Sequence, residues 1–127
     1  MEYELFNQLK KLAEDFNLDY LVLFGSRANG NYRVSSDYDL AFYKKNISID
    51  EEILMRDILD SIFTKVKYDL LNLEKDHTYY LLNQIYRYGK IIYLANKKLF
   101  QIEKEKSYFN YIDSKQDLLP LKMAYLS

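Results

Sequence analysis

The sequence predicts an α/β fold, with one small mixed sheet flanked by helices. Two observations carry this expectation. Short apolar runs of strand length alternate with segments whose apolar residues recur at helical spacing, in the order helix, strand, turn, strand, helix, strand, helix, strand, helix. The 127 residues include 49% hydrophobic and 29% charged residues, a globular composition that suits one core. We therefore expect a single domain over residues 1–127, without linkers or internal repeats.

The first elements follow from periodicity and from glycine. Apolar residues at helical spacing predict an amphipathic helix over residues 2–17. The apolar run at 19–24 stops at Gly25, which is typical of a buried strand that ends in a turn. After that turn, DYDLAFY at 37–43 predicts a second strand.

Capping signals define the next elements. Ser48 and Glu51 have the spacing of a capping box and stand ahead of ILMRDILDSIF, so we expect a helix from about residue 50 to 64. The apolar run at 66–73 predicts a third strand.

The C-terminal part is expected to be mostly helical. Residues 77–88 have a helical pattern that ends at Gly89, a plausible C-cap, and KIIYL at 90–94 predicts a short fourth strand. Apolar residues at helical spacing then predict a helical C-terminal extension over about 96–127. Its main helix is expected to end at Pro120, because proline lacks the backbone N–H that a helix interior requires.

Composition excludes several classes of protein. Cysteine is absent, so disulfides and thiolate metal sites are excluded. The net charge is −1, and no basic stripe stands out in the sequence. Both observations argue against a long nucleic acid bound through its backbone. The acidic, amphipathic N-terminus does not resemble a signal peptide, and no apolar run approaches the ~20 residues that span a bilayer, so we expect a cytoplasmic protein with no membrane partner. The only histidine, His77, is expected to be a surface residue rather than a catalytic base.

The most informative stretch is GSRANGNYRVSSDYD, from Gly25 to Asp39. A small turn after a strand leaves backbone N–H groups free for phosphate oxygens, and the hydroxyl of Ser26 can add a hydrogen bond. Arg27 or Arg33 could neutralise the β- and γ-phosphates of a nucleoside triphosphate. The Gly-Ser step therefore predicts a triphosphate-binding turn.

Three carboxylates predict a metal site beside that turn. Asp37 and Asp39 are two residues apart on a strand, so their side chains share one face. Two close carboxylates repel unless a hard cation lies between them, and magnesium is expected because substrate phosphates also hold it. If Asp69 reaches the same face from the third strand, the site can hold two ions.

The stretch GSRANGNYRVSSDYDLAFY resembles the signature of the DNA polymerase β-like nucleotidyltransferases, in particular the small minimal nucleotidyltransferases. LVLFGSRANG, SSDYDLAFY, KYDLLNL and IYRYGKIIY follow one another in the order expected for that family. The resemblance implies a mixed sheet flanked by helices, magnesium, and transfer of AMP from ATP with release of pyrophosphate. One position departs from the family, in which an arginine is common where Asn29 stands here.

The resemblance also implies roles for individual residues. Gly25 and Ser26 would bind the triphosphate, while Asp37 and Asp39 would hold both metal ions. Asp69 would complete the catalytic metal site and help deprotonate the acceptor hydroxyl.

The resemblance further implies a protein partner. Stand-alone members are typically antitoxins paired with a HEPN-domain toxin, and the best described transfer AMP to a tyrosine of that toxin. The segment KSYFNYIDSKQDLLPLKMAYLS resembles the tail of such proteins, and Tyr108, Phe109, Tyr111 and Tyr125 would suit a partner groove. Equally, this helix could cover its own domain. Two alternative functions stay open: a non-catalytic antitoxin that acts by occlusion, and transfer to a small molecule such as an aminoglycoside.

Overall fold

The computed structural model describes residues 2–117 and 119–126. Residues 1, 118 and 127, which the expected domain and its helical extension include, lie outside the described residues. The elements follow one another as α1 (Glu2–Asp15), β1 (Tyr20–Phe24), α2 (Ser26–Asn29), β2 (Tyr38–Tyr43), α3 (Ile49–Ile62), β3 (Tyr68–Asn72), α4 (Tyr79–Tyr88), β4 (Lys90–Leu94), α5 (Lys97–Asp117) and α6 (Leu119–Leu126). The predicted element order is confirmed, with strand ends that shift by one or two residues.

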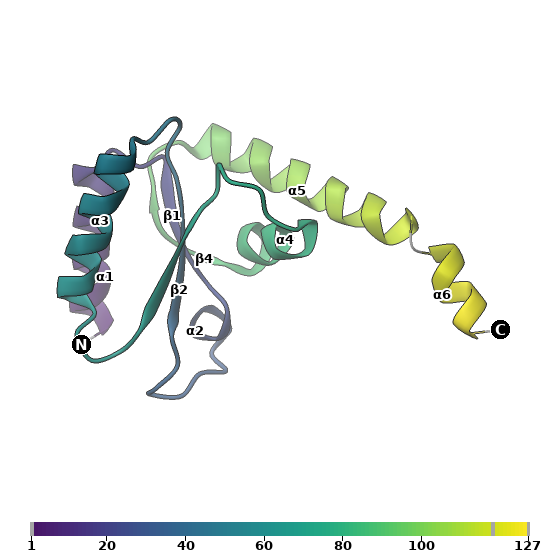
Figure 1. Cartoon of the computed structure of the whole chain (residues 1–127), viewed down its shortest axis with the longest axis horizontal. Coiled ribbons are helices and arrows are strands. Elements are labelled where there is room, and N and C mark those ends of the chain that lie inside the picture. Colours follow the sequence, from purple (N-terminus) through teal and green to yellow (C-terminus); the bar gives the residue numbers. More distant parts are fainter. Residues whose placement is uncertain (1, 118, 127) are drawn as a thin grey trace.

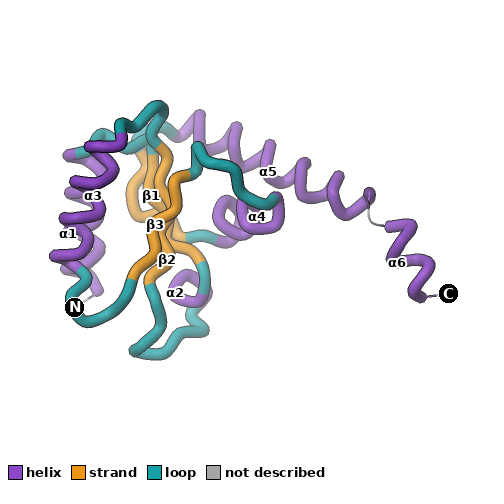
Figure 2. Tube along the Cα trace, viewed as in Figure 1, coloured by secondary structure: helices purple, strands orange, loops and turns teal. Residues whose placement is uncertain are grey.

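The four strands form one mixed sheet in the order β3-β2-β1-β4. Strand β1 pairs antiparallel with β2 and with β4, whereas β2 and β3 are parallel. The parallel pair needs a crossover connection, and α3 supplies it. Helices α1 and α3 cover one face of the sheet, while α4 and the first part of α5 cover the other (Figures 1 and 2). The expected α/β fold is confirmed.

Alternation along the strands divides the core into two layers. In β1, Leu21 and Leu23 pack toward α1 and α3, whereas Tyr20 and Val22 pack toward α4 and α5. All five residues of β1 are buried. A strand covered on both faces has no reason to alternate with polar residues, so β1 appears in the sequence as the continuous apolar run YLVLF.

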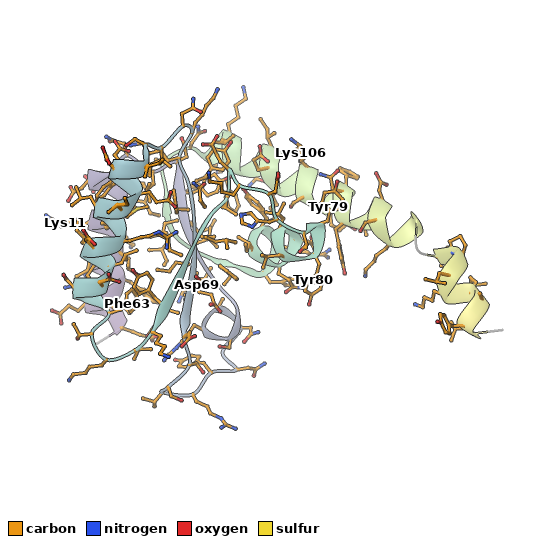
Figure 3. The ribbon with its side chains drawn as sticks, in the orientation of Figure 1. Lys11, Phe63, Asp69, Tyr79, Tyr80 and Lys106 are labelled. Carbon is orange, nitrogen blue, oxygen red and sulfur yellow. The ribbon has the colours of Figure 1, made fainter. Side chains whose placement is uncertain are left out.

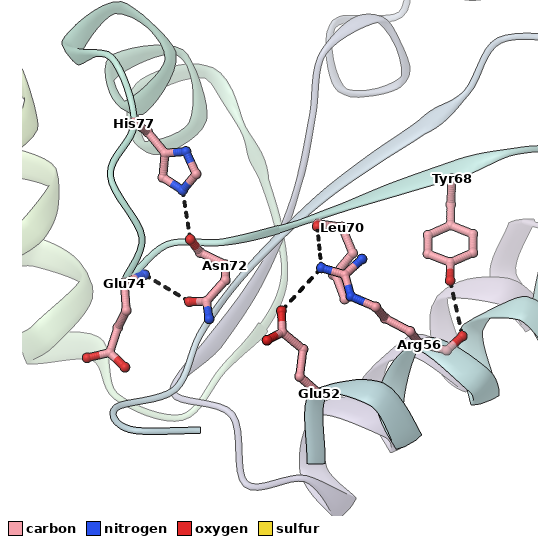
Figure 4. A network of polar contacts seen from close by, with 7 residues as sticks. All are labelled: Glu52, Arg56, Tyr68, Leu70, Asn72, Glu74 and His77. Carbon is pink, nitrogen blue, oxygen red and sulfur yellow. Dashed lines mark hydrogen bonds and ion pairs between the residues drawn. The ribbon is translucent and has the colours of Figure 1, made fainter. Parts of the chain in front are cut away.

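The edge strand β3 is fastened to α3 by polar contacts (Figure 4). Arg56 donates from Nη2 to the carbonyl of Leu70 at 3.0 Å and to Glu52 Oε1 at 3.2 Å. The Tyr68 hydroxyl donates to the carbonyl of Arg56 at 3.1 Å. These contacts satisfy polar groups of an edge strand that has no further strand partner in the described sheet. They also fix the strand that carries Asp69.

The end of β3 is fixed by a second polar contact. His77 Nε2 lies 2.7 Å from the carbonyl oxygen of Asn72, the last residue of β3 (Figure 4). Asn72 is buried, and its Oδ1 accepts a hydrogen bond from the backbone N–H of Glu74 at 2.9 Å. His77 is half-buried and contributes to the turn that follows β3.

Capping explains where several helices begin and end. Ser48 caps α3 as predicted, and its side chain accepts a hydrogen bond from the N–H of Glu51. Gly89 is the C-cap of α4, but with φ of −68° it is not left-handed. Glycine is needed there for space, because a Cβ would meet the carbonyl oxygen of Ile85 and the side chain of Val22.

The prediction that the C-terminal helix ends at Pro120 is wrong. Helix α5 ends at Asp117, and a further helix, α6, contains Pro120 at its second position. A proline is tolerated in the first turn of a helix, since the backbone N–H that it lacks would have no intrahelical acceptor there. No helix in the described part of the chain is long and apolar enough to cross a membrane.

A buried pair of tyrosines gives a stability test of the layer beneath α4 and α5. The hydroxyls of Tyr20 and Tyr86 are hydrogen-bonded to each other at 2.6 Å, in side chains that are 0% and 5% exposed. Burial raises the pKa of both, so both are neutral at pH 7. Replacing Tyr20 with phenylalanine leaves a buried hydroxyl unpaired and should lower the free energy of unfolding by about 1–2 kcal/mol. In urea melts, the variant with both Tyr20 and Tyr86 replaced by phenylalanine should have nearly the same unfolding midpoint as Tyr20→Phe alone. A loss in the free energy of unfolding twice that of the single variant would contradict this.

Candidate active site

Three aspartates lie near the end of the sheet at which β2 and β3 begin. Asp39 on β2 is in register with Asp69 on the parallel strand β3. Asp37 comes directly before β2, and its charge acts on the Asp39 carboxyl. Ala41 and Leu71, each two residues further along its strand, pack in the core layer beneath α4 and α5. Asp39 and Asp69 thus occupy the face that α4 and α5 cover further along the strands. Figure 3 labels Asp69 on β3, between α3 and α4.

The carboxylates are close enough to repel one another. Asp39 is half-buried, whereas Asp37 and Asp69 are exposed. Burial raises the pKa of the Asp39 carboxyl, and the charges of Asp69 and Asp37 raise it further. Even so, no three or more acidic, histidine or cysteine side chains among the described residues are gathered closely enough to hold a metal ion. The site is an open acidic cluster whose mutual repulsion a cation would relieve.

Gly25 brings the backbone against this cluster. It directly follows β1 and has φ of 73° and ψ of −154°, a conformation that is essentially restricted to glycine. A Cβ at this position would collide with Oδ2 of Asp39. The residue is therefore glycine for two reasons, the backbone conformation and the close approach to a carboxylate.

Ser26 opens the short helix α2 directly after Gly25. The amides of Ala28 and Asn29 donate to the carbonyl of Gly25 at 3.1 and 3.3 Å, whereas the first amides of a helix have no intrahelical acceptor. The Ser26 side chain is half-buried, and in the described structure its hydroxyl has no hydrogen-bond partner. The predicted Gly-Ser turn thus leaves a hydroxyl and backbone donors beside the carboxylates.

The two candidate arginines differ in what they contact. Arg27 Nη2 donates to the carbonyls of Val34 and Ser36 at 2.9 and 3.0 Å, so much of its guanidinium is engaged within the chain. Arg33 is exposed, and its side chain makes no ion pair with any described residue. The triphosphate role of either arginine stays a prediction. Only Arg33 has its guanidinium free to take up such a role without breaking contacts.

Three polar or aromatic residues shape the site through contacts that their sequence does not predict. Asn29, the position that departs from the family, accepts a hydrogen bond at Oδ1 from the backbone N–H of Asn31 at 3.0 Å and closes the turn around Gly30. Ser36 and Tyr38, which flank Asp37, both contact Arg27. A tyrosine and a serine beside an aspartate have no sequence pattern that marks them as structural contacts of a distant arginine.

A comparison with protein families identifies the fold family. The model described as "Polymerase beta, Nucleotidyltransferase" matches residues 7–98, which include all seven predicted site residues. The chain belongs to the polymerase β nucleotidyltransferase family. The resemblance in the sequence is confirmed, and so is the enzyme class, nucleotidyltransferase. No curated protein sequence matches the chain.

Solved structures of low sequence identity share the fold. A chain of a toxin–antitoxin complex with AMP-PNP has a TM-score of 0.75 at 20% identity, covering 96% of this chain and 98% of that one. A chain from the complex of tri-AMPylated Shewanella oneidensis HEPN toxin with MNT antitoxin has a TM-score of 0.72 at 18% identity, with 100% of each chain covered. A chain of the MntA-HepT toxin–antitoxin complex has a TM-score of 0.71 at 18% identity, covering 98% and 99%. At these identities the likeness shows the nucleotidyltransferase fold.

Proposed function

We propose that this chain is a magnesium-dependent nucleotidyltransferase that transfers AMP from ATP to a tyrosine hydroxyl of a HEPN toxin, and so acts as an antitoxin. The observation that carries the proposal is that Asp39 and Asp69 are in register on one sheet face beside the Gly25–Ser26 turn, with Asp37 directly before β2. The fold neighbours support the partner and the nucleotide, since one contains AMP-PNP and another an AMPylated HEPN toxin with an MNT antitoxin.

The three aspartates fit a hard divalent cation by their chemistry. They offer carboxylate oxygens, which magnesium prefers, and their mutual repulsion favours a bound positive charge. Asp37 and Asp39 would hold two ions, and Asp69 would complete the catalytic site. Bound magnesium would neutralise phosphate charge and polarise the α-phosphoryl group.

The remaining residues of the site suit the handling of substrate. The Ser26 hydroxyl and the amides of the Gly25–Ser26 turn can donate to triphosphate oxygens, and Arg33 can reach from an exposed position. In the reaction the acceptor oxygen bonds to the α-phosphorus while the bond to pyrophosphate breaks. Asp69 takes the proton of the acceptor hydroxyl, as a general base does.

The C-terminal region supports a protein acceptor. The first part of α5 packs on its own domain through the buried Phe100 and Ser107. Beyond it, Tyr108, Phe109 and Tyr125 are exposed, and α6 has no buried residue. Figure 1 shows α5 and α6 extending away from the sheet. We propose one catalytic domain whose helical extension, from about residue 96, contacts the toxin, with the reaction taking place in the cytoplasm, where ATP is available.

Intact mass spectrometry tests the proposed function. The chain is incubated with a HEPN protein encoded beside it, magnesium, and each nucleoside triphosphate in turn. The proposal expects the partner to gain the mass of one or more AMP units from ATP. A tight complex without mass gain would instead support occlusion, and a gain on an aminoglycoside alone would support transfer to small molecules.

Asp69→Asn separates binding from chemistry. Because Asp69 is exposed at the edge of the cluster, its replacement should leave most of the ATP affinity while lowering the rate of AMP transfer about a hundredfold or more. Titration calorimetry with a non-hydrolysable ATP analogue measures the affinity, and single-turnover transfer measures the rate. Near-normal turnover in this variant would show that the third ligand and base are misassigned.

A further inference from the structure

Arg27 occupies an unusual position for a residue beside a predicted phosphate site. Its guanidinium carbon lies over two aromatic rings, 4.4 Å from the ring centre of Tyr32 and 4.3 Å from that of Tyr38. The guanidinium also donates hydrogen bonds to backbone carbonyls. Nε and Nη2 donate to the carbonyl of Ser36 at 3.2 and 3.0 Å, and Nη2 donates to the carbonyl of Val34 at 2.9 Å. The Arg27 guanidinium therefore makes cation–π contacts and hydrogen bonds at the same time.

These contacts fall on both sides of Asp37. The Ser36 carbonyl belongs to the peptide bond that joins Ser36 to Asp37, and the stacked ring of Tyr38 is the next side chain. Arg27 itself is the second residue of α2 and directly follows Ser26. One side chain therefore connects the triphosphate turn to the backbone that carries the first aspartate.

One other contact fixes the backbone at Asp37: the amide of Tyr38, in the peptide bond that joins these two residues, donates to the carbonyl of Lys67 at 3.0 Å. The side chain of Asp37 is exposed and makes no hydrogen bond or ion pair with any described residue. The turn before it closes on itself, with the Ser36 amide donating to the carbonyl of Arg33 at 3.0 Å and the Arg33 amide donating to Ser36 Oγ at 2.9 Å. That turn gives local shape, but it does not connect the loop to α2.

We propose that Arg27 is a positioning residue that holds the 31–37 loop against α2 and thereby sets Asp37 relative to Asp39 and Ser26. The consequence for catalysis rests on the proposed function, whereas the clamp itself is a property of the ligand-free chain. Lysine cannot replace the arginine, because an ammonium cannot donate in the plane of a fork to two carbonyls while it also lies over two rings. The competing interpretation is that Arg27 leaves the loop and binds a phosphate directly.

The first test measures the loop without metal or nucleotide. Backbone amide exchange is followed at Ser36 and Tyr38, whose amides donate to the carbonyls of Arg33 and Lys67, in the full chain for wild type, Arg27→Lys and Arg27→Met. We expect exchange about tenfold faster in both variants, since both lose the planar hydrogen bonds. Arg87→Lys is the matched control: Arg87 also lies over two tyrosine rings, at 5.6 and 5.1 Å, but it is on α4. Exchange in the loop should be unchanged in this control.

The second test measures the carboxylates. Manganese binding in the absence of nucleotide should weaken several-fold in both Arg27 variants, since Asp37 is no longer held in place. In transfer assays kcat should fall more than the KM for ATP rises. The opposite pattern overturns the proposal: Arg27→Lys with wild-type loop exchange and manganese affinity, and Arg27→Met with only a raised KM for ATP, would indicate a direct phosphate contact.

A milder pair of variants keeps the test sound if the Arg27 variants fold poorly. Tyr32→Ala removes one of the two rings and should speed loop exchange by a smaller factor, while Tyr32→Phe retains the ring and should match wild type. Equal exchange in both would overturn the clamp. Loop exchange is independent of catalysis, so a wild-type chain that transfers nothing would refute the proposed function while the clamp is still judged by its own result.

Discussion

Replacing Asp39 with asparagine should lower the rate of AMP transfer about a thousandfold or more and, at the same time, stabilise the metal-free protein. The loss follows from the position of Asp39, which is half-buried between Asp37 and Asp69 and lies against Gly25. A neutral amide there holds a divalent cation poorly, and the charge stabilisation that the cation supplies in phosphoryl transfer is lost.

The gain in stability follows from the same geometry. Burial and the neighbouring charges raise the pKa of Asp39 in the folded state, so the ionised carboxyl opposes folding at pH 7. Asp39→Asn removes that charge and should raise the free energy of unfolding by about 1 kcal/mol. The gain should shrink as pH falls through the raised pKa of the folded state, and it should be lost below about 4, where the carboxyl is protonated in both the folded and the unfolded state. Urea melts in EDTA at several pH values measure it.

Asp57→Asn is the matched control for the effects expected of Asp39→Asn. Asp57 is exposed on α3, on the other side of the sheet, and Asp57→Asn should change neither transfer nor the response to magnesium. If Asp39→Asn retained transfer within a few-fold of wild type, Asp39 would not be a metal ligand in the reaction.

Gly25→Ala is expected to have the second large effect, and on both stability and activity. The backbone at Gly25 is in a region that an alanine enters only with strain, and the added Cβ would collide with the Asp39 carboxylate. We expect a loss of about 2–3 kcal/mol in the free energy of unfolding and the loss of measurable transfer.

Gly30→Ala is the control that separates strain from collision. Gly30 also has a positive φ, 82°, but a Cβ there has no atom within 4 Å. It should therefore cost about 1 kcal/mol, the penalty of the backbone conformation alone, with transfer retained. Equal losses of stability and activity at the two glycines would show that the contact with Asp39 has no special role.

The sequence was sufficient for the parts of the site that depend on local geometry. A short apolar run opened by DYD predicts the strand that carries Asp39, although the strand begins at Tyr38 and leaves Asp37 directly before it. The stop of the apolar run at Gly25 likewise locates the turn. The pairing of Asp39 with Asp69 is different, because it depends on the parallel register that the crossover through α3 sets, and only the family resemblance pointed to it in advance.

The features that sequence reasoning missed depend on contacts at a distance. Arg27 next to Ser26 is plausible as a phosphate ligand, and its stacking on Tyr32 and Tyr38 becomes visible only when the loop is folded. In the sequence Pro120 predicts the end of a helix, although a proline is equally compatible with the beginning of one.

The proposed transfer of AMP is tested by following the fate of each phosphorus of ATP. The chain and its HEPN partner are incubated with magnesium and ATP labelled at either the α- or the γ-phosphorus. We predict that α-label becomes bound to the partner, that γ-label is released as pyrophosphate, and that Asp39→Asn abolishes both. Transfer of γ-label to the partner, or α-label transfer that is unaffected by Asp39→Asn, would contradict this prediction.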